Sequence, residues 1–99
     1  MITGQQCRAG RALVEVSREK LTRRSGVDEA TIENFERLID APTPEAIVAL
    51  EKALEDLGAV FIAENGGGMG VRLKFNSSEA KRIAGMEGEG GIVASDRVP

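Results

Sequence analysis

Apolar residues recur at helical spacing in four segments of the chain, and a residue type that commonly caps helices stands before each segment. The four capping residues are Thr3, Ser17, Asp28 and Thr43. The pattern predicts helices over residues 4–15, 18–25, 29–37 and 44–57. Gly26 can supply the positive φ of a sharp turn after the second helix, and Gly58 ends the fourth. We therefore expect residues 4–57 to form one compact helical core.

Beyond Gly58 the pattern becomes extended. Residues 60–62 are rich in β-formers, residues 71–75 alternate strictly, and the glycine-rich residues 65–70 lie between them. This predicts a β-hairpin of residues 59–63 and 71–75. Residues 76–99 hold scattered glycines and polar residues that cannot bury a stripe, so they predict a flexible tail, in which Ser77 could cap a short helix. The expected fold is mainly α, with four to five helices, then a hairpin and a tail.

Composition narrows the chemistry of this domain. Phenylalanine is the only aromatic residue type among the 99 residues, so the predicted core is aliphatic. It comprises Leu13, Val14, Val16, Leu21, Val27, Ile32, Phe35 and Leu50. With Cys7 as its one cysteine and no histidine, the chain lacks ligands for a zinc site and residues for a Cys/His dyad or a Ser/His/Asp triad. The glycine-rich loop also lacks the Gly-Lys-Ser/Thr sequence of a phosphate-binding loop. We expect no enzyme activity, cofactor or metal ion.

The sequence also bears on where the protein acts. No apolar run approaches the roughly 20 residues of a membrane-spanning helix, and the N-terminus has no apolar signal-peptide core. These features favour a cytoplasmic protein that makes no contact with membranes.

Charge is distributed unevenly along the chain, although the total is only −3. Residues 1–26 hold six basic and two acidic residues, a balance of +4, whereas residues 27–64 hold two basic and ten acidic residues, a balance of −8. The basic residues that we expect on one exposed face are Arg8, Arg18, Lys20, Arg23 and Arg24. Such asymmetry indicates a polyanion or partner surface near the N-terminus, although solvated helix faces also carry charge clusters.

Two stretches of the chain carry a family resemblance. Residues 11–36 contain Ser17 and Leu21 at the spacing Ser-x-x-x-Leu, then the triplet Ser-Gly-Val, then Ala-Thr-Ile, and finally Phe-Glu. This stretch resembles the helix-turn-helix of the phage-repressor (Cro-like, XRE-type) family. Residues 58–74, GAVFIAENGGGMGVRLK, look like the hairpin that follows this domain in a short bacterial subgroup. Together the two stretches hold 43 of the 99 residues of the chain.

The resemblance implies a helix-turn-helix DNA-binding domain over residues 1–58, a candidate dimerisation hairpin over 59–75 and a tail over 76–99. It also implies a sequence-specific transcriptional regulator that occupies an operator in double-stranded DNA as a homodimer. The third helix would lie in the major groove while the second crosses the backbone.

Specific residues follow from the resemblance. The implied DNA-binding residues are Arg18, Lys20, Arg23, Asp28, Glu29, Ala30, Thr31 and Asn34. Arg18 can donate to a phosphate or to guanine, Asn34 can pair with adenine, and Ala30 can touch a thymine methyl group. Each also has a plain alternative: a solvated arginine, a polar surface residue and a good helix former, respectively. Arg11 and Glu36 are implied to form a structural ion pair that fixes how the helices cross.

Two departures from the family pattern keep a second function open. Glu29 and Glu33 bring negative charge to a helix that has to approach phosphates. The turn after the third helix usually carries a glycine, whereas Leu38 and Ile39 stand here, so either the helix continues or another chain covers them. The alternative is a helix-turn-helix-fold protein-interaction module, antagonist or antitoxin-like, that binds a protein through the acidic third helix, through an exposed Leu38 and Ile39, or through the tail.

Overall fold

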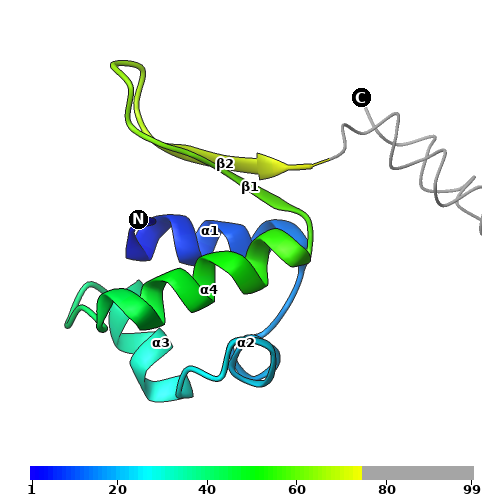
Figure 1. The fold of residues 1–99 in the computed structure, drawn as a ribbon, viewed down its shortest axis with the longest axis vertical. Helices are drawn as coiled ribbons and strands as arrows, with labels where there is room; N and C mark the ends of the chain where they lie inside the picture. Colours follow the sequence, from blue (N-terminus) through cyan, green and yellow to red (C-terminus); the bar gives the residue numbers. More distant parts are fainter. Residues whose placement is uncertain (75–99) are drawn as a thin grey trace, which may run out of the picture.

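In a computed structural model of the chain, residues 1–74 are described, and they form four helices followed by a two-stranded antiparallel hairpin (Figure 1). The elements are α1 (Gly4–Val14), α2 (Arg18–Ser25), α3 (Glu29–Glu36), α4 (Pro44–Asp56), β1 (Ala59–Ile62) and β2 (Gly70–Leu73). The expectation of a small, mainly helical fold with a hairpin is confirmed. The predicted tail and its short helix lie outside the described residues. None of the helices within residues 1–74 is long and apolar enough to cross a membrane.

The elements form three layers, which Figure 1 shows one below another. The hairpin packs on one side of α1 and α4, while α2 and α3 pack on the other side of the same two helices. The hairpin and the α2–α3 pair therefore face away from each other, so each can contact a ligand without covering the other.

Side-chain caps explain where the helices begin. Thr3 accepts a hydrogen bond from the backbone N–H of Gln6, and the Gln6 side chain accepts one from the backbone N–H of Thr3, which completes a capping box. The hydroxyls of Ser17 and Thr43 and the carboxylate of Asp28 accept from the backbone N–H three residues on. All four predicted caps are confirmed.

The helix ends differ slightly from the prediction. Helix α1 ends at Val14 rather than residue 15 because Glu15 adopts a left-handed conformation with φ of +59°. Helix α3 ends at Glu36, and Leu38 has φ of +61°, so the helix does not continue through Leu38 and Ile39. Gly26, with φ of +78°, makes the predicted turn after α2, where a side chain would be disfavoured.

The aliphatic core lies between the helices. Leu21, Ile32, Leu50 and Leu54 are fully buried, and burying each such side chain contributes about 1.5–3 kcal/mol. Of the predicted core, Val16, Leu21, Val27, Ile32, Phe35 and Leu50 are buried and Val14 is half-buried. The assignment of Leu13 was wrong, because its side chain is 39% exposed. Leu13 stands six residues after the buried Cys7, which turns it about 120° away around the helix axis.

The hairpin is shorter than predicted and is tied to the start of α1. Its strands pair from Ala59 with Leu73 to Ile62 with Gly70, so β2 begins and ends earlier than residues 71–75. The buried Gln6 side chain donates to the carbonyl oxygens of Ile62 (3.1 Å) and Gly70 (2.8 Å), the last pair of the ladder. One buried amide therefore closes the hairpin onto α1.

Candidate nucleic-acid interface

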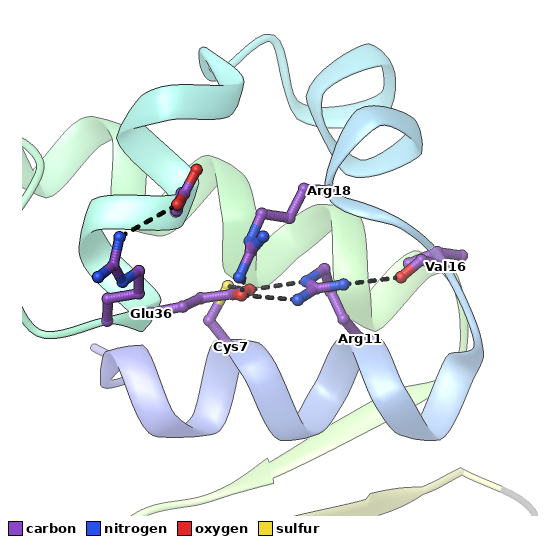
Figure 2. A network of polar contacts seen from close by, with 7 residues as sticks. Cys7, Arg11, Val16, Arg18 and Glu36 are labelled. Carbon is purple, nitrogen blue, oxygen red and sulfur yellow. Dashed lines mark hydrogen bonds and ion pairs between the residues drawn. The ribbon is translucent and has the colours of Figure 1, made fainter.

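The carboxylate of Glu36, at the end of α3, is the centre of a polar network that joins three helices (Figure 2). Its side chain is fully buried. Arg11, from α1, donates from Nε and from Nη2 to the two carboxylate oxygens, each at 2.7 Å, and from Nη1 to the carbonyl oxygen of Val16 at 3.1 Å. The ion pair between Arg11 and Glu36 that the resemblance implied is therefore present in bidentate form.

Two further side chains reach the same carboxylate. Arg18, the first residue of α2, donates from Nε to Glu36 Oε1 at 3.1 Å, and the thiol of Cys7 donates to Oε2 at 3.3 Å. Figure 2 shows the three donors converging on Glu36, with Cys7 and Arg11 coming from α1 and Arg18 from the start of α2. The network thereby fixes α3 relative to α1 and to the start of α2.

The pairing decides the ionisation of the network. Burial disfavours the charged carboxylate of Glu36, but the hydrogen bonds and the charge of Arg11 outweigh it, and they hold the pKa of Glu36 below its usual range. Burial raises the pKa of the Cys7 thiol, and the neighbouring Glu36 raises it further. Glu36 therefore stays charged and Cys7 stays a protonated donor at neutral pH.

Residues 26–28 connect α2 to α3, and hydrogen bonds hold this connection in one shape. The backbone N–H of Gly26 donates to the carbonyl of Thr22, and the Ser25 hydroxyl accepts from the backbone N–H of Val27. Val27 is buried, so it anchors the connection to the core. The beginning of α3 is thus held in place while its own side chains stay accessible.

The structure distributes the predicted DNA-binding residues over two exposed surfaces and one inward-facing position. On α2, Lys20 and Arg23 are exposed, and Arg23 pairs with Glu19 at 3.3 Å. At the start of α3, Asp28, Glu29 and Ala30 are exposed, whereas Thr31 and Asn34 are half-buried. Arg18 turns toward Glu36, and its side chain is 31% exposed. Arg8 and Arg24, of the predicted basic face, are exposed.

A groove of about 620 Å³ runs between α3 and the beginning of α4. It collects Asp28, Thr31 and Asn34 from the predicted site, together with Asp40 and Glu45. Within the part of the chain that the structure describes, no lysine or arginine lines this groove. Part of the surface predicted to meet DNA is therefore acidic.

The turn between α3 and α4 is apolar and exposed. Leu38 and Ile39 are 63% and 59% exposed, and they line a smaller hollow of about 350 Å³ with Phe35, Asp40 and Ala41. Leu38 holds a left-handed backbone conformation that favours glycine, the residue that the family pattern places in this turn. The sequence left two alternatives for Leu38 and Ile39: a third helix that continues through them, or cover by another chain. Helix α3 ends at Glu36, so cover by another chain stays a prediction.

Comparison of the chain with models of known protein families found no match, and comparison with curated proteins found none. The site is therefore interpreted from its own geometry.

Sequence reasoning missed several contacts of this region. The residues around Gln6 in the sequence do not indicate that its side chain binds the hairpin. The sequence also does not indicate that Cys7 and Arg18 donate hydrogen bonds to Glu36. The one signal for Gln6 in the sequence is its position three residues after Thr3, which is typical of a capping box but does not indicate its hydrogen bonds to the hairpin. The groove is built from α3, the α3–α4 turn and α4, so no single segment of the sequence predicts it.

Proposed function

We propose that the chain is a sequence-specific DNA-binding regulator of transcription, in which α2, the connection over residues 26–28 and α3 form a helix-turn-helix. The observation that carries this proposal is the Glu36 network. It fixes one end of α3 between α1 and α2 and leaves the other end, at Asp28, Glu29 and Ala30, exposed. A recognition helix needs this combination, because its base-reading residues must be accessible while its angle to the second helix is constant.

Charges on α2 support contact with a phosphate backbone. Lys20, Arg23 and Arg24 are exposed on this helix, and exposed cations near phosphates supply much of the affinity of DNA-binding proteins. Arg18 donates to Glu36 through Nε, and within the described residues its Nη nitrogens have no hydrogen-bond partner. Arg18 can therefore be positioned by Glu36 and still donate outward to a phosphate.

The hairpin suits the homodimer that the resemblance implies. A two-stranded ribbon is marginally stable alone and presents unpaired strand edges, and Ile62 and Leu73 are partly exposed on it. Since the hairpin lies on the side of the molecule away from α2 and α3, pairing of two hairpins leaves both recognition helices free (Figure 1). They would address half-sites about 34 Å apart. Sedimentation that shows only monomer at high micromolar concentration, with and without DNA, would contradict the proposed homodimer.

The proposal is tested by titrating a fluorescent random-sequence duplex and a pool of genomic fragments with the protein at two salt concentrations. We expect binding that weakens as salt rises. The double variant Lys20→Gln/Arg23→Gln should bind more weakly at every salt concentration. The control Lys52→Gln, which removes an exposed lysine from α4, should bind like the wild type and is compared with the single variant Lys20→Gln.

Two single variants refine the same titration. Arg18→Ala should lose about 1–3 kcal/mol of binding free energy. Glu29→Gln should raise the affinity for random duplex, because it removes a repulsion near phosphates. A wild-type protein that binds no duplex even at low salt contradicts the proposed function.

A further inference from the structure

The groove between α3 and α4 is chemically suited to a cation. Its carboxylates are Asp28, Asp40 and Glu45, all on exposed residues. Asp28 and Asp40 each accept one backbone N–H bond, which leaves further acceptor positions on both carboxylates. A phosphate in this groove would be repelled, whereas a lysine or arginine side chain would be attracted.

The groove has an apolar part that fits the stem of such a side chain. The apolar lining residues are Val27, Ala41, Pro42, Ala46 and Ala49. Lysine and arginine side chains carry an aliphatic stem below the charged group, and the stem packs on surfaces of this kind while the charge meets a carboxylate. The groove is therefore matched to long cationic side chains rather than to a bare metal ion.

An apolar hollow adjoins this groove. The hollow formed by Phe35, Leu38 and Ile39 shares Asp40 and Ala41 with the groove, so the two make one continuous surface. Leu38 keeps a left-handed backbone conformation that disfavours leucine, and its exposure means that packing within the described residues compensates for little of this. An aliphatic side chain from another molecule would bury both Leu38 and Ile39.

We propose that the groove and the hollow together bind a basic, amphipathic segment of a partner protein, which places lysine or arginine in the groove and an aliphatic residue in the hollow. Charge complementarity selects the basic residues, and the exposed Leu38 and Ile39 select the aliphatic one. The basic face of α2 in a second copy does not meet this requirement, because Leu21, the large aliphatic residue of α2, is fully buried.

The position of the groove has a regulatory consequence. Asp28, Thr31 and Asn34, three of the implied DNA-binding residues, line it, so a bound segment would keep duplex DNA away from this part of α3. This competition rests on the proposed function, whereas binding of the segment does not.

The test begins with phage-displayed random linear peptides selected on the full-length protein. We expect the enriched peptides to carry basic residues beside an aliphatic residue. A synthetic copy of an enriched peptide is then titrated by fluorescence anisotropy against the wild type and the rim variant Asp40→Asn/Glu45→Gln. The rim variant should bind about tenfold more weakly, as is typical when charges of complementary surfaces are removed.

One control separates the groove from general acidity, and one further variant tests the hollow. Glu55→Gln/Asp56→Asn removes two exposed charges from the end of α4, outside the groove lining, and should change the peptide affinity by less than about twofold, because exposed charges that do not meet the peptide contribute little. Leu38→Asn keeps a residue that tolerates the left-handed conformation and removes the aliphatic side chain, so we expect about a fivefold loss of affinity.

Several results would overturn the inference. They are enriched peptides without basic residues, equal peptide affinity of the rim variant and the control, and amide chemical-shift changes confined to the hairpin. Two further results would show that the surface binds this chain and not a partner protein. They are binding of a synthetic peptide of residues 75–99, or self-association in sedimentation, that the wild type shows and the rim variant lacks.

A competition experiment distinguishes the proposed DNA binding from the proposed binding of a basic segment. Adding the peptide to the protein–duplex complex should release the duplex. If the protein binds no duplex, the proposed function fails and the peptide result stands. If it binds duplex but selects no basic peptide, the inference fails and the proposed function stands.

Discussion

The two ends of α3 carry carboxylates in opposite environments. At one end Glu36 is fully buried and accepts from Arg11, Arg18 and Cys7. At the other end Asp28 and Glu29 are exposed, and Asp28 accepts a single backbone N–H bond. The same residue chemistry therefore maintains the structure at one end and is available to a ligand at the other.

The difference shows how the eight residues of α3 can both hold the helix in place and leave side chains accessible to a ligand. Because the paired end carries the contacts that orient α3, substitutions at the exposed end can alter binding without changing the angle of the helix. A charged residue that loses its partners is expensive only where it is buried.

Removing the buried carboxylate should have the largest effect. Glu36→Ala leaves the half-buried guanidinium of Arg11 without its partner, and we expect a loss of about 3–5 kcal/mol in the free energy of unfolding. Urea denaturation followed by circular dichroism measures it. Glu33→Ala, an exposed carboxylate on the same helix that pairs with Arg37, should cost less than about 1 kcal/mol. Similar losses in both variants would remove the contrast between the two ends.

The buried end should also respond to acid. The pKa of Glu36 in the folded protein lies below its ordinary value of 4.5, so the unfolded chain binds more protons between these two values. The contribution of Glu36 to the free energy of unfolding is therefore complete above pH 4.5 and is lost as the pH falls through the folded pKa. Urea denaturation of the wild type and of Glu36→Gln over a pH series should show a difference that shrinks in acid. A difference independent of pH would be inconsistent with a paired, charged Glu36.

Gln6 offers a comparable test for the hairpin. Gln6→Ala leaves the carbonyl oxygens of Ile62 and Gly70 without their side-chain donor, and we expect a cost of about 1–3 kcal/mol. Hydrogen exchange should show faster exchange of the β1 and β2 amides, with α3 amides less affected. Uniform acceleration over the whole chain would mean that the hairpin does not open separately.

The exposed carboxylates at the rim of the groove, Asp40 and Glu45, should give the smallest change in stability. Asp40→Asn/Glu45→Gln alters two exposed residues, so the free energy of unfolding should stay within about 0.5 kcal/mol of the wild type. Thermal denaturation provides the measurement. A clear loss of stability would show that these carboxylates support the fold.

The contrast between the ends also explains what sequence could predict. The caps at Thr3, Ser17, Asp28 and Thr43 act on the backbone three residues on, so local spacing was sufficient to place every helix within one or two residues. The prediction for Leu13 failed although spacing could have corrected it, because its six-residue offset from Cys7 turns it away from the buried face of α1.

Contacts between distant residues were harder to predict. The pairing of Arg11 with Glu36 came from family resemblance, and the second role of Arg18 did not follow from it. The hydrogen bonds from Gln6 to Ile62 and Gly70 join positions more than fifty residues apart. The acidic groove combines residues of α3, the following turn and α4, so its charge appears only once these segments are folded together.

Chemical-shift mapping of the isotope-labelled protein during titration with duplex DNA tests whether α3 contacts DNA, because it reports every backbone amide at once. We expect salt-sensitive shifts in α2, in residues 26–28 and at the beginning of α3, with little change at Glu36 and in the hairpin beyond effects of dimerisation. Shifts confined to the hairpin, or no shift at low salt, would contradict the assignment of α3 as a recognition helix.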